Sequence, residues 1–398
     1  MNSERALLLQ CLKDFCHHQK TEKFSDEVDW ERFEKLLQSQ SLGGLVYHQC
    51  EKWIPRHFRH FLLQEAYFSV NRQILFEEIA KGLTERCIPF ICMKGSVLRE
   101  YYPVKELRTM GDIDFIIHTE DREAVDSMMC SDLCYNKFVD NHAVWTYYIK
   151  DYQIEVHDHM FYEHLTNDFD YQSYFDNIWH HKRYGSVFGY TLEYLYIPEP
   201  DTHFLYLMTH TAKHILNKGS GFRPYLDMVL MCQSNDLDWQ YLEKELANIC
   251  LLDFTKTCFA LCEEWFDVKM PLEHGKIDPV FLKQITDKTF HDGIFGLDNE
   301  QNAGAHTAKE IERSKGNYQL GSLMIIIRLL FPPYRDMQLI PWYSFVDGRP
   351  WLMPIAWVYR WFYCITHKLK SSFQKLSEPV RLRKTIKQRE IYIKDWGL

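Results

Sequence analysis

The stretch KGSVLREYYPVKELRTMGDIDFII occupies residues 94–117 and decides the fold expected for this chain. It overlaps the end of PFICMKG (89–95), a short apolar run that ends in glycine, and it closes with DIDFII (112–117), a second run that is apolar except for its two aspartates. Apolar runs of this length are typical of buried β-strands. Between them, SVLREYY (96–102) has a helix-like pattern. The stretch therefore predicts a strand, a Gly-Ser turn, a helix and a second strand.

The segments that follow continue this alternation. TEDREAVDSMM (119–129) opens with helix-capping residues and predicts a helix. AVWTYYI (143–149) and IEVHDHM (154–160) predict two strands joined by a tight turn. Strand, helix, strand, helix and hairpin together predict an α/β or α+β core over residues 89–185.

Helical segments are expected on both sides of this core. In the first 88 residues, Leu75, Ile79 and Leu83 recur at every fourth position and form one apolar stripe. A strand or hairpin arm at 189–201 ends at Asp201, an expected helix N-cap. We expect four parts: an N-terminal helical region (1–88), the core (89–185), a helical substrate or cover region (186–290) and a mostly helical C-terminal region with a basic tail (291–398).

Three carboxylates are the candidate metal ligands. Residues two apart in a strand point to the same side, so Asp112 and Asp114 present both carboxylates on one face. A divalent cation removes the repulsion between them, and Glu155 on another predicted strand is a candidate third ligand. An Asp-x-Asp pair alone is more often a solvated strand end. The ordered set of Gly-Ser turn, Asp-x-Asp strand and later carboxylate strand is much more specific.

The Gly95-Ser96 pair is the candidate phosphate-binding turn. It follows a predicted strand and opens a predicted helix, which leaves backbone N–H groups free to receive phosphate oxygens. Taken alone, such a pair is usually only a turn.

With these segments together, the chain resembles the DNA-polymerase-beta-like nucleotidyltransferase superfamily, and more closely an uncharacterised bacterial branch of it. The similarity is strongest over 94–117 and extends from about residue 40 to 365. IEVHDH (154–159), HTAKH (210–214), FRPYLDMVL (222–230) and RLLFPP (328–333) are similar to further segments of that branch. An aromatic residue often follows the first His of the IEVHDH strand in the branch, whereas here Asp158 does. The implied fold is α+β, with a nucleotidyltransferase-type mixed sheet core, flanking helices and a mostly helical C-terminal region.

The resemblance also implies roles for the site residues. Gly95 and Ser96 would hold nucleotide phosphates. Asp112 and Asp114 would bind two Mg²⁺ (or Mn²⁺) ions, and Glu155 would bind the ion that activates the acceptor hydroxyl. The cationic side chains Lys94 and Arg108 are candidates to neutralise triphosphate charge. The alternatives are a surface charge at a strand end for Lys94 and a surface ion pair with Glu106 or Glu100 for Arg108.

Five further residues are possible accessory groups. His157 shares the predicted face of Glu155, as a base, a supporting group or a packed histidine. His210 and His214 lie one helical turn apart, and we favour packing or a substrate pocket over a metal site for them. Arg223 and Asp227 have the same spacing. They are candidates to line the acceptor pocket, although an ordinary helix ion pair is the favoured interpretation.

Charge argues against a long nucleic-acid partner. The net charge is −9, and the tail from Lys368 to Asp395 holds nine Lys/Arg and three acids, a net +6, which leaves −15 on the rest of the chain. An acidic body repels phosphate backbones. Small nucleotides are still compatible with it, because bound metal ions can locally invert the field.

The N-terminal sequence and the apolar runs predict a cytoplasmic protein. Lys13 and Asp14 break the first apolar run, unlike a signal peptide. The longest apolar stretches are well below the roughly 20 residues that span a bilayer. The twelve cysteines are therefore expected as reduced thiols.

Three functions are compatible with these features. The leading one is a metal-dependent enzyme that moves a nucleotidyl group, most simply AMP from ATP, to a small molecule or protein. The second is a non-catalytic nucleotide-binding regulator with the same fold. The third is a membrane-surface protein, because Trp351, Trp357, Trp361 and Tyr363 followed by the basic tail resemble an interfacial anchor; we favour packing of these aromatic residues on the protein itself.

Overall fold

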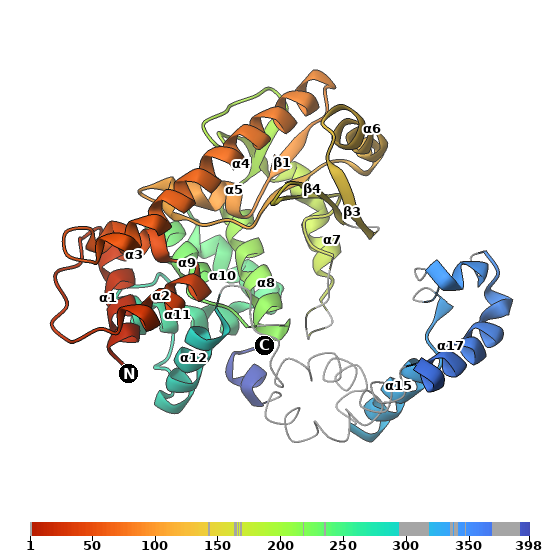
Figure 1. The fold of residues 1–398 in the computed structure, drawn as a ribbon. Helices are drawn as coiled ribbons and strands as arrows, with labels where there is room; N and C mark the ends of the chain where they lie inside the picture. The colour runs from red at the N-terminus through yellow and green to blue at the C-terminus, as the bar shows by residue number, and fades with distance from the viewer. Residues whose placement is uncertain are drawn as a thin grey trace. The chain divides into compact units, whose positions relative to one another are not determined.

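The computed structural model describes residues 2–141, 144–162, 165, 167, 169–217, 219–234, 236–293, 318–334, 337, 341–346, 348–367 and 391–398. The chain divides into two compact units (Figure 1). The first comprises residues 1–297 together with 396–398, and the second comprises residues 298–395. The predicted division into four parts stays a prediction.

A seven-stranded mixed sheet forms the centre of the first unit, in the strand order β3-β4-β5-β2-β1-β7-β6. The strands are β1 (Phe90–Cys92), β2 (Asp112–Ile116), β3 (Asn136–Asn141), β4 (Val144–Ile149), β5 (Tyr152–His157), β6 (Lys182–Tyr184) and β7 (Leu195–Pro198). The pairs β2–β5 and β1–β7 are parallel, and the remaining neighbours are antiparallel. The predicted α+β class with a mixed sheet is therefore confirmed.

Helices surround this sheet. The longer ones in the first unit are α1 (Ser3–Cys16), α2 (Trp30–Gln40), α3 (Gly43–Cys50), α4 (Arg59–Glu85), α8 (Pro200–Asn217), α9 (Arg223–Gln233), α10 (Trp239–Asn248), α11 (Leu252–Phe266) and α12 (Pro279–Asp292); short ones are α5 (Gly95–Leu98), α6 (Arg122–Ser127) and α7 (Tyr171–Phe175). Helix α1 packs against α3, α9 and α11, so the N-terminal helices and those after residue 200 form one helical group.

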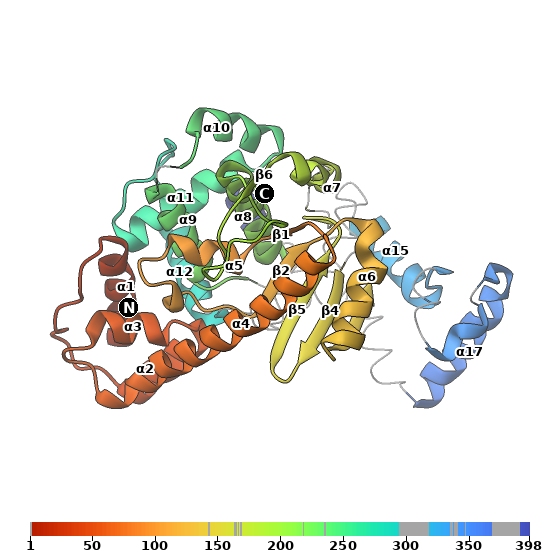
Figure 2. The ribbon, with the colours of Figure 1, turned by 90° about the horizontal axis from the view of Figure 1, so that it is seen from above.

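Helices α4 and α6 cover one face of the sheet (Figure 2). Ile79 and Leu83 of α4 are buried there against Ile113 and Phe115 of β2 and Val156 of β5. Because side chains alternate along a strand, the residues between these apolar positions face the opposite side of the sheet. The apolar stripe predicted on α4 thus fixes which face of β2 and β5 is left for polar side chains.

Two helices begin at other residues than capping residues alone would indicate. Ser25 and Asp26 are residues typical of a helix start, but the helix begins at Trp30, where Asp29 accepts hydrogen bonds from the backbone N–H groups of Glu31 and Arg32. Helix α8 begins at Pro200, so Asp201 lies inside it instead of at its N-cap. Proline in the first turn of a helix needs no hydrogen-bond partner, which explains the earlier start.

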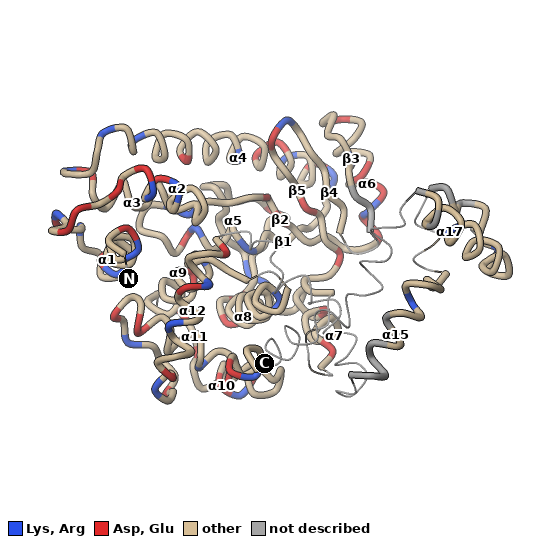
Figure 3. The backbone as a smooth tube through the Cα atoms, turned by 60° about the horizontal axis from the view of Figure 1, so that its bottom comes forward, with Lys and Arg blue, Asp and Glu red and all other residues tan. Residues whose placement is uncertain are grey.

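The second unit contains α15 (Tyr318–Leu330) and α17 (Met353–His367), which carry few charged residues (Figure 3). The rings of Trp357 and Trp361 pack on Phe331, whereas Trp351 and Tyr363 are exposed. None of the described helices is both long enough and apolar enough to cross a membrane. Most of the basic tail, 368–390, lies outside the described residues, so the membrane-surface hypothesis stays a prediction.

The burial of Trp396 allows a test of how much residues 396–398 stabilise the first unit. It is fully buried between Phe254 of α11 and Phe281 of α12, with ring centroids 5.6 and 5.9 Å away. We expect Trp396→Ala to lower the free energy of unfolding by about 3–5 kcal/mol in urea titrations, because it leaves a large cavity. The control Trp351→Ala, at a position 69% exposed, should change it by less than about 0.5 kcal/mol. Equal effects would contradict this packing.

Candidate active site

The parallel pairing of β2 and β5 brings two of the predicted metal ligands together. Asp114 is the register partner of Glu155, and Ile116 is the partner of His157. Asp112, Asp114, Glu155 and His157 all lie on the sheet face opposite the α4 core, because the intervening residues are buried in that core. A site with three carboxylates and an imidazole therefore sits on one face of two adjacent strands.

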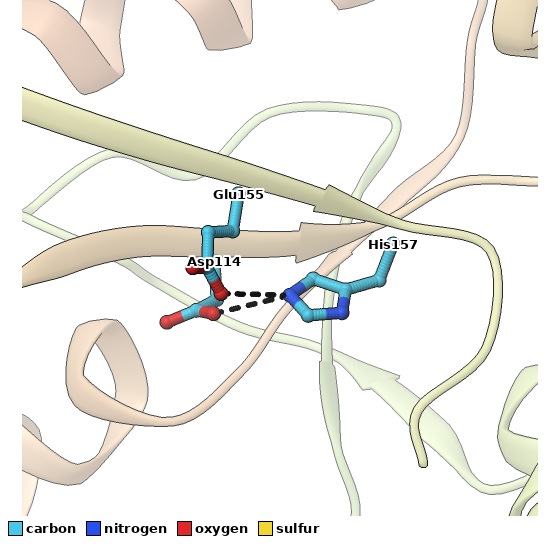
Figure 4. Close-up of side chains that lie close together, drawn as sticks. All are labelled: Asp114, Glu155 and His157. Atoms are coloured by element: carbon cyan, nitrogen blue, oxygen red, sulfur yellow. Dashed lines mark hydrogen bonds and ion pairs between the residues drawn. The ribbon is translucent and has the colours of Figure 1, made fainter. Parts of the chain in front are cut away.

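Asp114, Glu155 and His157 form a tight group (Figure 4). The Nε2 atom of His157 lies 3.2 Å from Oδ1 of Asp114 and 3.5 Å from Oε2 of Glu155. Each residue offers one ligand atom, and these atoms all lie within 4.8 Å of one another. His157, predicted only as an accessory residue, is thus placed directly beside the carboxylates; the signal was its i,i+2 spacing from Glu155.

Lys94 also lies within this group. Its ammonium forms an ion pair with Asp114 and lies 3.6 Å from Oε2 of Glu155, with the side chain 17% exposed. Burial alone would lower the pKa of Lys94, but Asp114, Tyr206, Asp112 and Glu155 together outweigh burial and hold this pKa well above its ordinary value. Burial would likewise raise the pKa of Asp114, but Lys94 and His157 hold it below its usual value. The alternative of a surface charge for Lys94 is wrong.

The backbone at Lys94 is strained. Its φ of 52° and ψ of −129° fall in a region that favours glycine. Such conformations cost about 1–3 kcal/mol and persist where surrounding contacts hold them. The ion pair with Asp114 is such a contact, and it directs the Lys94 side chain onto the carboxylates.

Asp112 stands apart from the tight group but belongs to the same electrostatic environment. Burial, followed by the charge of Asp114, raises its pKa from 3.8 to about 6. Lys94 acts in the opposite direction, and so does Arg223. A carboxyl group with so high a pKa is one whose ionised form lacks sufficient cationic partners.

The Gly95-Ser96 turn lies where β1 leads into α5. Helix α5 begins at Gly95, as the sequence predicts. A Cβ atom at this position would come 2.8 Å from Nη1 of Arg108 and 3.2 Å from Cγ of Met110, so a side chain cannot be accommodated without displacing them. Ser96 is fully buried, and its hydroxyl has no hydrogen-bond partner in the described structure.

Arg108 is engaged in a buried ion pair with Asp227 of α9. The Nε and Nη2 atoms of Arg108 donate to the two carboxylate oxygens of Asp227, each over 2.8 Å, and the Tyr102 hydroxyl donates to the same carboxylate over 2.9 Å. Two interpretations are therefore wrong: the alternative of a surface pair of Arg108 with Glu100 or Glu106, and the favoured helix ion pair of Arg223 with Asp227. Arg223 instead donates to the carbonyl of Thr109, over 3.0 Å.

Helix α8 presents aromatic and imidazole rings near Lys94. Burial lowers the pKa of His210 well below its ordinary value, and His214 and Lys94 add to this effect, so His210 is neutral at neutral pH. Its ring stacks on Tyr206 at 5.6 Å and lies 4.4 Å from the ring of His214. Tyr206 was missed from the sequence, although its spacing of four residues from His210 placed it on the same helix face.

Comparison with known proteins agrees with this arrangement. A family model described as uncharacterised nucleotidyltransferase matches residues 26–267, which contain the whole sheet and every site residue named above. The chain belongs to this family. No curated protein and no solved structure matches the chain significantly. The predicted family is confirmed, and the matched range includes both the sheet and its site.

The donor set fits a divalent cation. Oδ2 of Asp114 and Nδ1 of His157 are buried and have no hydrogen-bond partner among the described residues. Carboxylate oxygens suit Mg²⁺ and Mn²⁺, and an imidazole nitrogen adds affinity for transition metals. Asp114, Glu155 and His157 would hold one ion, with Asp112 as a further ligand. A nucleotidyltransferase site with a histidine beside its carboxylates is expected to favour Mn²⁺ over Mg²⁺.

This preference can be measured. We expect His157→Gln to weaken Mn²⁺ binding by about tenfold, and Mg²⁺ binding much less, because only the imidazole nitrogen distinguishes the two ions here. Calorimetric titration of each ion gives the ratio of affinities. The exposed residue His57 provides the control variant His57→Gln. An unchanged Mn²⁺ to Mg²⁺ ratio in His157→Gln would exclude His157 as a ligand.

The effect of Asp112 ionisation can be tested through the free energy of unfolding of the protein. A carboxyl whose folded pKa is about 6 and whose ordinary pKa is 3.8 destabilises the fold as pH rises from 4 to 6, because the folded state holds the proton more tightly. In EDTA, Asp112→Asn should therefore stabilise the protein by up to about 3 kcal/mol at pH 7.5, but by only about 0.5 kcal/mol at pH 4. Urea titrations at both pH values measure this. Stabilisation of the same size at both would show that ionisation is not the cause.

Proposed function

We propose that the protein transfers a nucleotidyl group, most simply AMP from ATP, to a hydroxyl group of an acceptor. The observation that carries this proposal is the parallel register of β2 and β5, which sets Asp114 beside Glu155, with Asp112 on the same face. Bound Mg²⁺ or Mn²⁺ supplies Lewis-acid stabilisation of the phosphate charge. Family membership supports nucleotide chemistry.

The proposed reaction is a single displacement at the α-phosphorus of the nucleoside triphosphate. The acceptor oxygen forms a bond to this phosphorus, the bond from the phosphorus to the bridging oxygen of the β-phosphate breaks, and pyrophosphate leaves with the electron pair. The hydroxyl proton passes to water. In this proposal the Gly95 turn and the unpartnered Ser96 hydroxyl would donate hydrogen bonds to phosphate oxygens, and Lys94 would supply a positive charge beside them.

The predicted non-catalytic regulator remains a second candidate, because Lys94 already neutralises part of the carboxylate charge. Such a protein would bind nucleotide without releasing pyrophosphate. Long nucleic acid is disfavoured as an acceptor, because the chain apart from its tail is acidic.

The decisive experiment incubates the protein with each labelled nucleoside triphosphate and a cell extract, and measures pyrophosphate release and label transfer. We expect Asp112→Asn and Glu155→Gln each to lower turnover by about a thousandfold, the effect of losing several kcal/mol of electrostatic stabilisation. The exposed residue Glu193 provides the charge-matched control, Glu193→Gln. Magnesium-dependent nucleotide binding without pyrophosphate release would identify the regulator instead.

Asp112→Asn is a cleaner variant for this experiment than Asp114→Asn. Asp114 is paired with both Lys94 and His157, and removing its charge leaves a largely buried ammonium without its main partner. Loss of one partner from a buried pair typically destabilises a protein by about 3–5 kcal/mol. A loss of turnover in Asp114→Asn would therefore be mixed with a loss of folding, whereas Asp112→Asn is expected to keep the fold.

A further inference from the structure

A cavity of about 270 Å³ lies beside the start of β2, between the N-terminal helices and residues 99–110. Helix α4 lines it with residues three or four apart, among them Glu65, Phe68 and Arg72. Arg99 and Arg108 line the same cavity from the chain that leads to Asp112. None of these positions is used for metal binding in the site described above.

Two of the arginines have unused hydrogen-bonding capacity. Arg72 stacks over the rings of Phe68 and Tyr152 at 5.5 and 5.7 Å, and within the described residues no carboxylate lies within ion-pair distance of it. Arg99 is 4% exposed; its Nη2 donates to Ser69 over 3.0 Å, while its Nε is buried without a partner. Nη2 of Arg99 also forms an ion pair with the half-exposed Glu106, whose Oε1 lies 3.6 Å away. Guanidinium groups so placed are suited to binding a carboxylate or phosphate.

A carboxyl group in the same cavity is suited to donate a hydrogen bond. Oε1 of Glu65 accepts a hydrogen bond from the Gly44 backbone over 3.0 Å, while Oε2 is buried and has no partner. Burial raises the pKa of Glu65 to about 8, so that this carboxyl carries a proton at neutral pH. It therefore does not repel an anion as an ionised glutamate would.

The cavity adjoins the candidate active site through shared residues. Arg108 and Met110 line the cavity and also lie against Gly95 of the phosphate-binding turn. Nη2 of Arg72 lies 3.5 Å from the carbonyl oxygen of Gly111, the residue before Asp112. A molecule held in the cavity is thus next to the start of the Asp-x-Asp strand. The volume, slightly below that of a drug-sized pocket, suits a small molecule and not a nucleotide.

We propose that this cavity binds the acceptor, and that the acceptor is a small hydroxyl compound with an anionic group, a carboxylate or a phosphate, held by Arg72 and Arg99. This inference rests on the proposed function and narrows its acceptor to a class. The hydroxyl group points toward Asp112, where the nucleotide is attacked. Glu65 donates a hydrogen bond to a neutral oxygen of the same molecule.

The test uses inorganic phosphate and glycolate, the simplest hydroxy carboxylate, as probes in calorimetric titrations of the full chain. We expect one or both to bind, and Arg72→Gln and Arg99→Gln to weaken that binding by about tenfold or more. The control Arg32→Gln changes an arginine that is 75% exposed on α2, and should leave it unchanged. ATP affinity, measured in parallel, should stay within about twofold in all three variants. The probe that binds more tightly identifies the anionic group.

Arg72→Lys guards against a purely structural effect, because it keeps the charge and should restore part of the anion binding. Failure of the wild type to bind either anion, or unchanged binding in both glutamine variants, would overturn the assignment of the cavity. So would a parallel loss of ATP affinity, since the cavity would then hold the nucleotide. If the anions bind as expected but no preparation releases pyrophosphate, the proposed function fails, and the acceptor role with it.

Discussion

The parallel pairing of β2 with β5 is the constraint on which the site depends. It joins strands that are far apart in sequence and sets Asp114 directly beside Glu155. A shift of this register by one residue would turn Glu155 and His157 toward the α4 core and place Val156 among the charges. The apolar residues on the other face, buried under α4 and α6, oppose such a shift. The charged side chains on one face of the sheet are therefore held in position by hydrophobic packing on the other face.

The buried ion pair of Arg108 with Asp227 holds the sheet and the helical group together in a similar way. It joins the chain that enters β2 to helix α9, and Arg223 adds a second link to Thr109. Breaking a buried charge pair is far more disruptive than losing a surface pair. The charge of Arg108 is already balanced by Asp227. Arg108 is thus better explained as a residue that positions the Gly95-Ser96 turn and the cavity than as one that neutralises triphosphate charge.

The sequence predicted β1, β2, β4, β5 and β7, the faces of β2 and β5, and the family, because these follow from local patterns, whereas β3 and β6 were not predicted. Alternation placed Asp112 and Asp114 on one face, and the same rule brought His157 to the side of Glu155. Such local rules could not predict which residues far apart in the sequence pair with each other. Arg108 pairs with a residue 119 positions away, and the short-range alternatives of Glu106 for Arg108 and Arg223 for Asp227 were both wrong. Arg72 lies in an ordinary helical stretch, and only the folded chain shows that it borders a cavity.

The location of Lys94 has a consequence for the order in which ligands assemble. The carboxylates of Asp114 and Glu155 are not bare: a fixed ammonium, held by a strained backbone, already balances part of their charge. A divalent ion approaching alone would meet both the attraction of the carboxylates and the repulsion of this lysine. An ion that arrives complexed to a polyphosphate brings negative charge for Lys94 to contact, and the whole assembly stays close to electroneutral. Under the proposed function, the charge of Lys94 would therefore make binding of a nucleotide-bound ion more favourable than binding of a free ion.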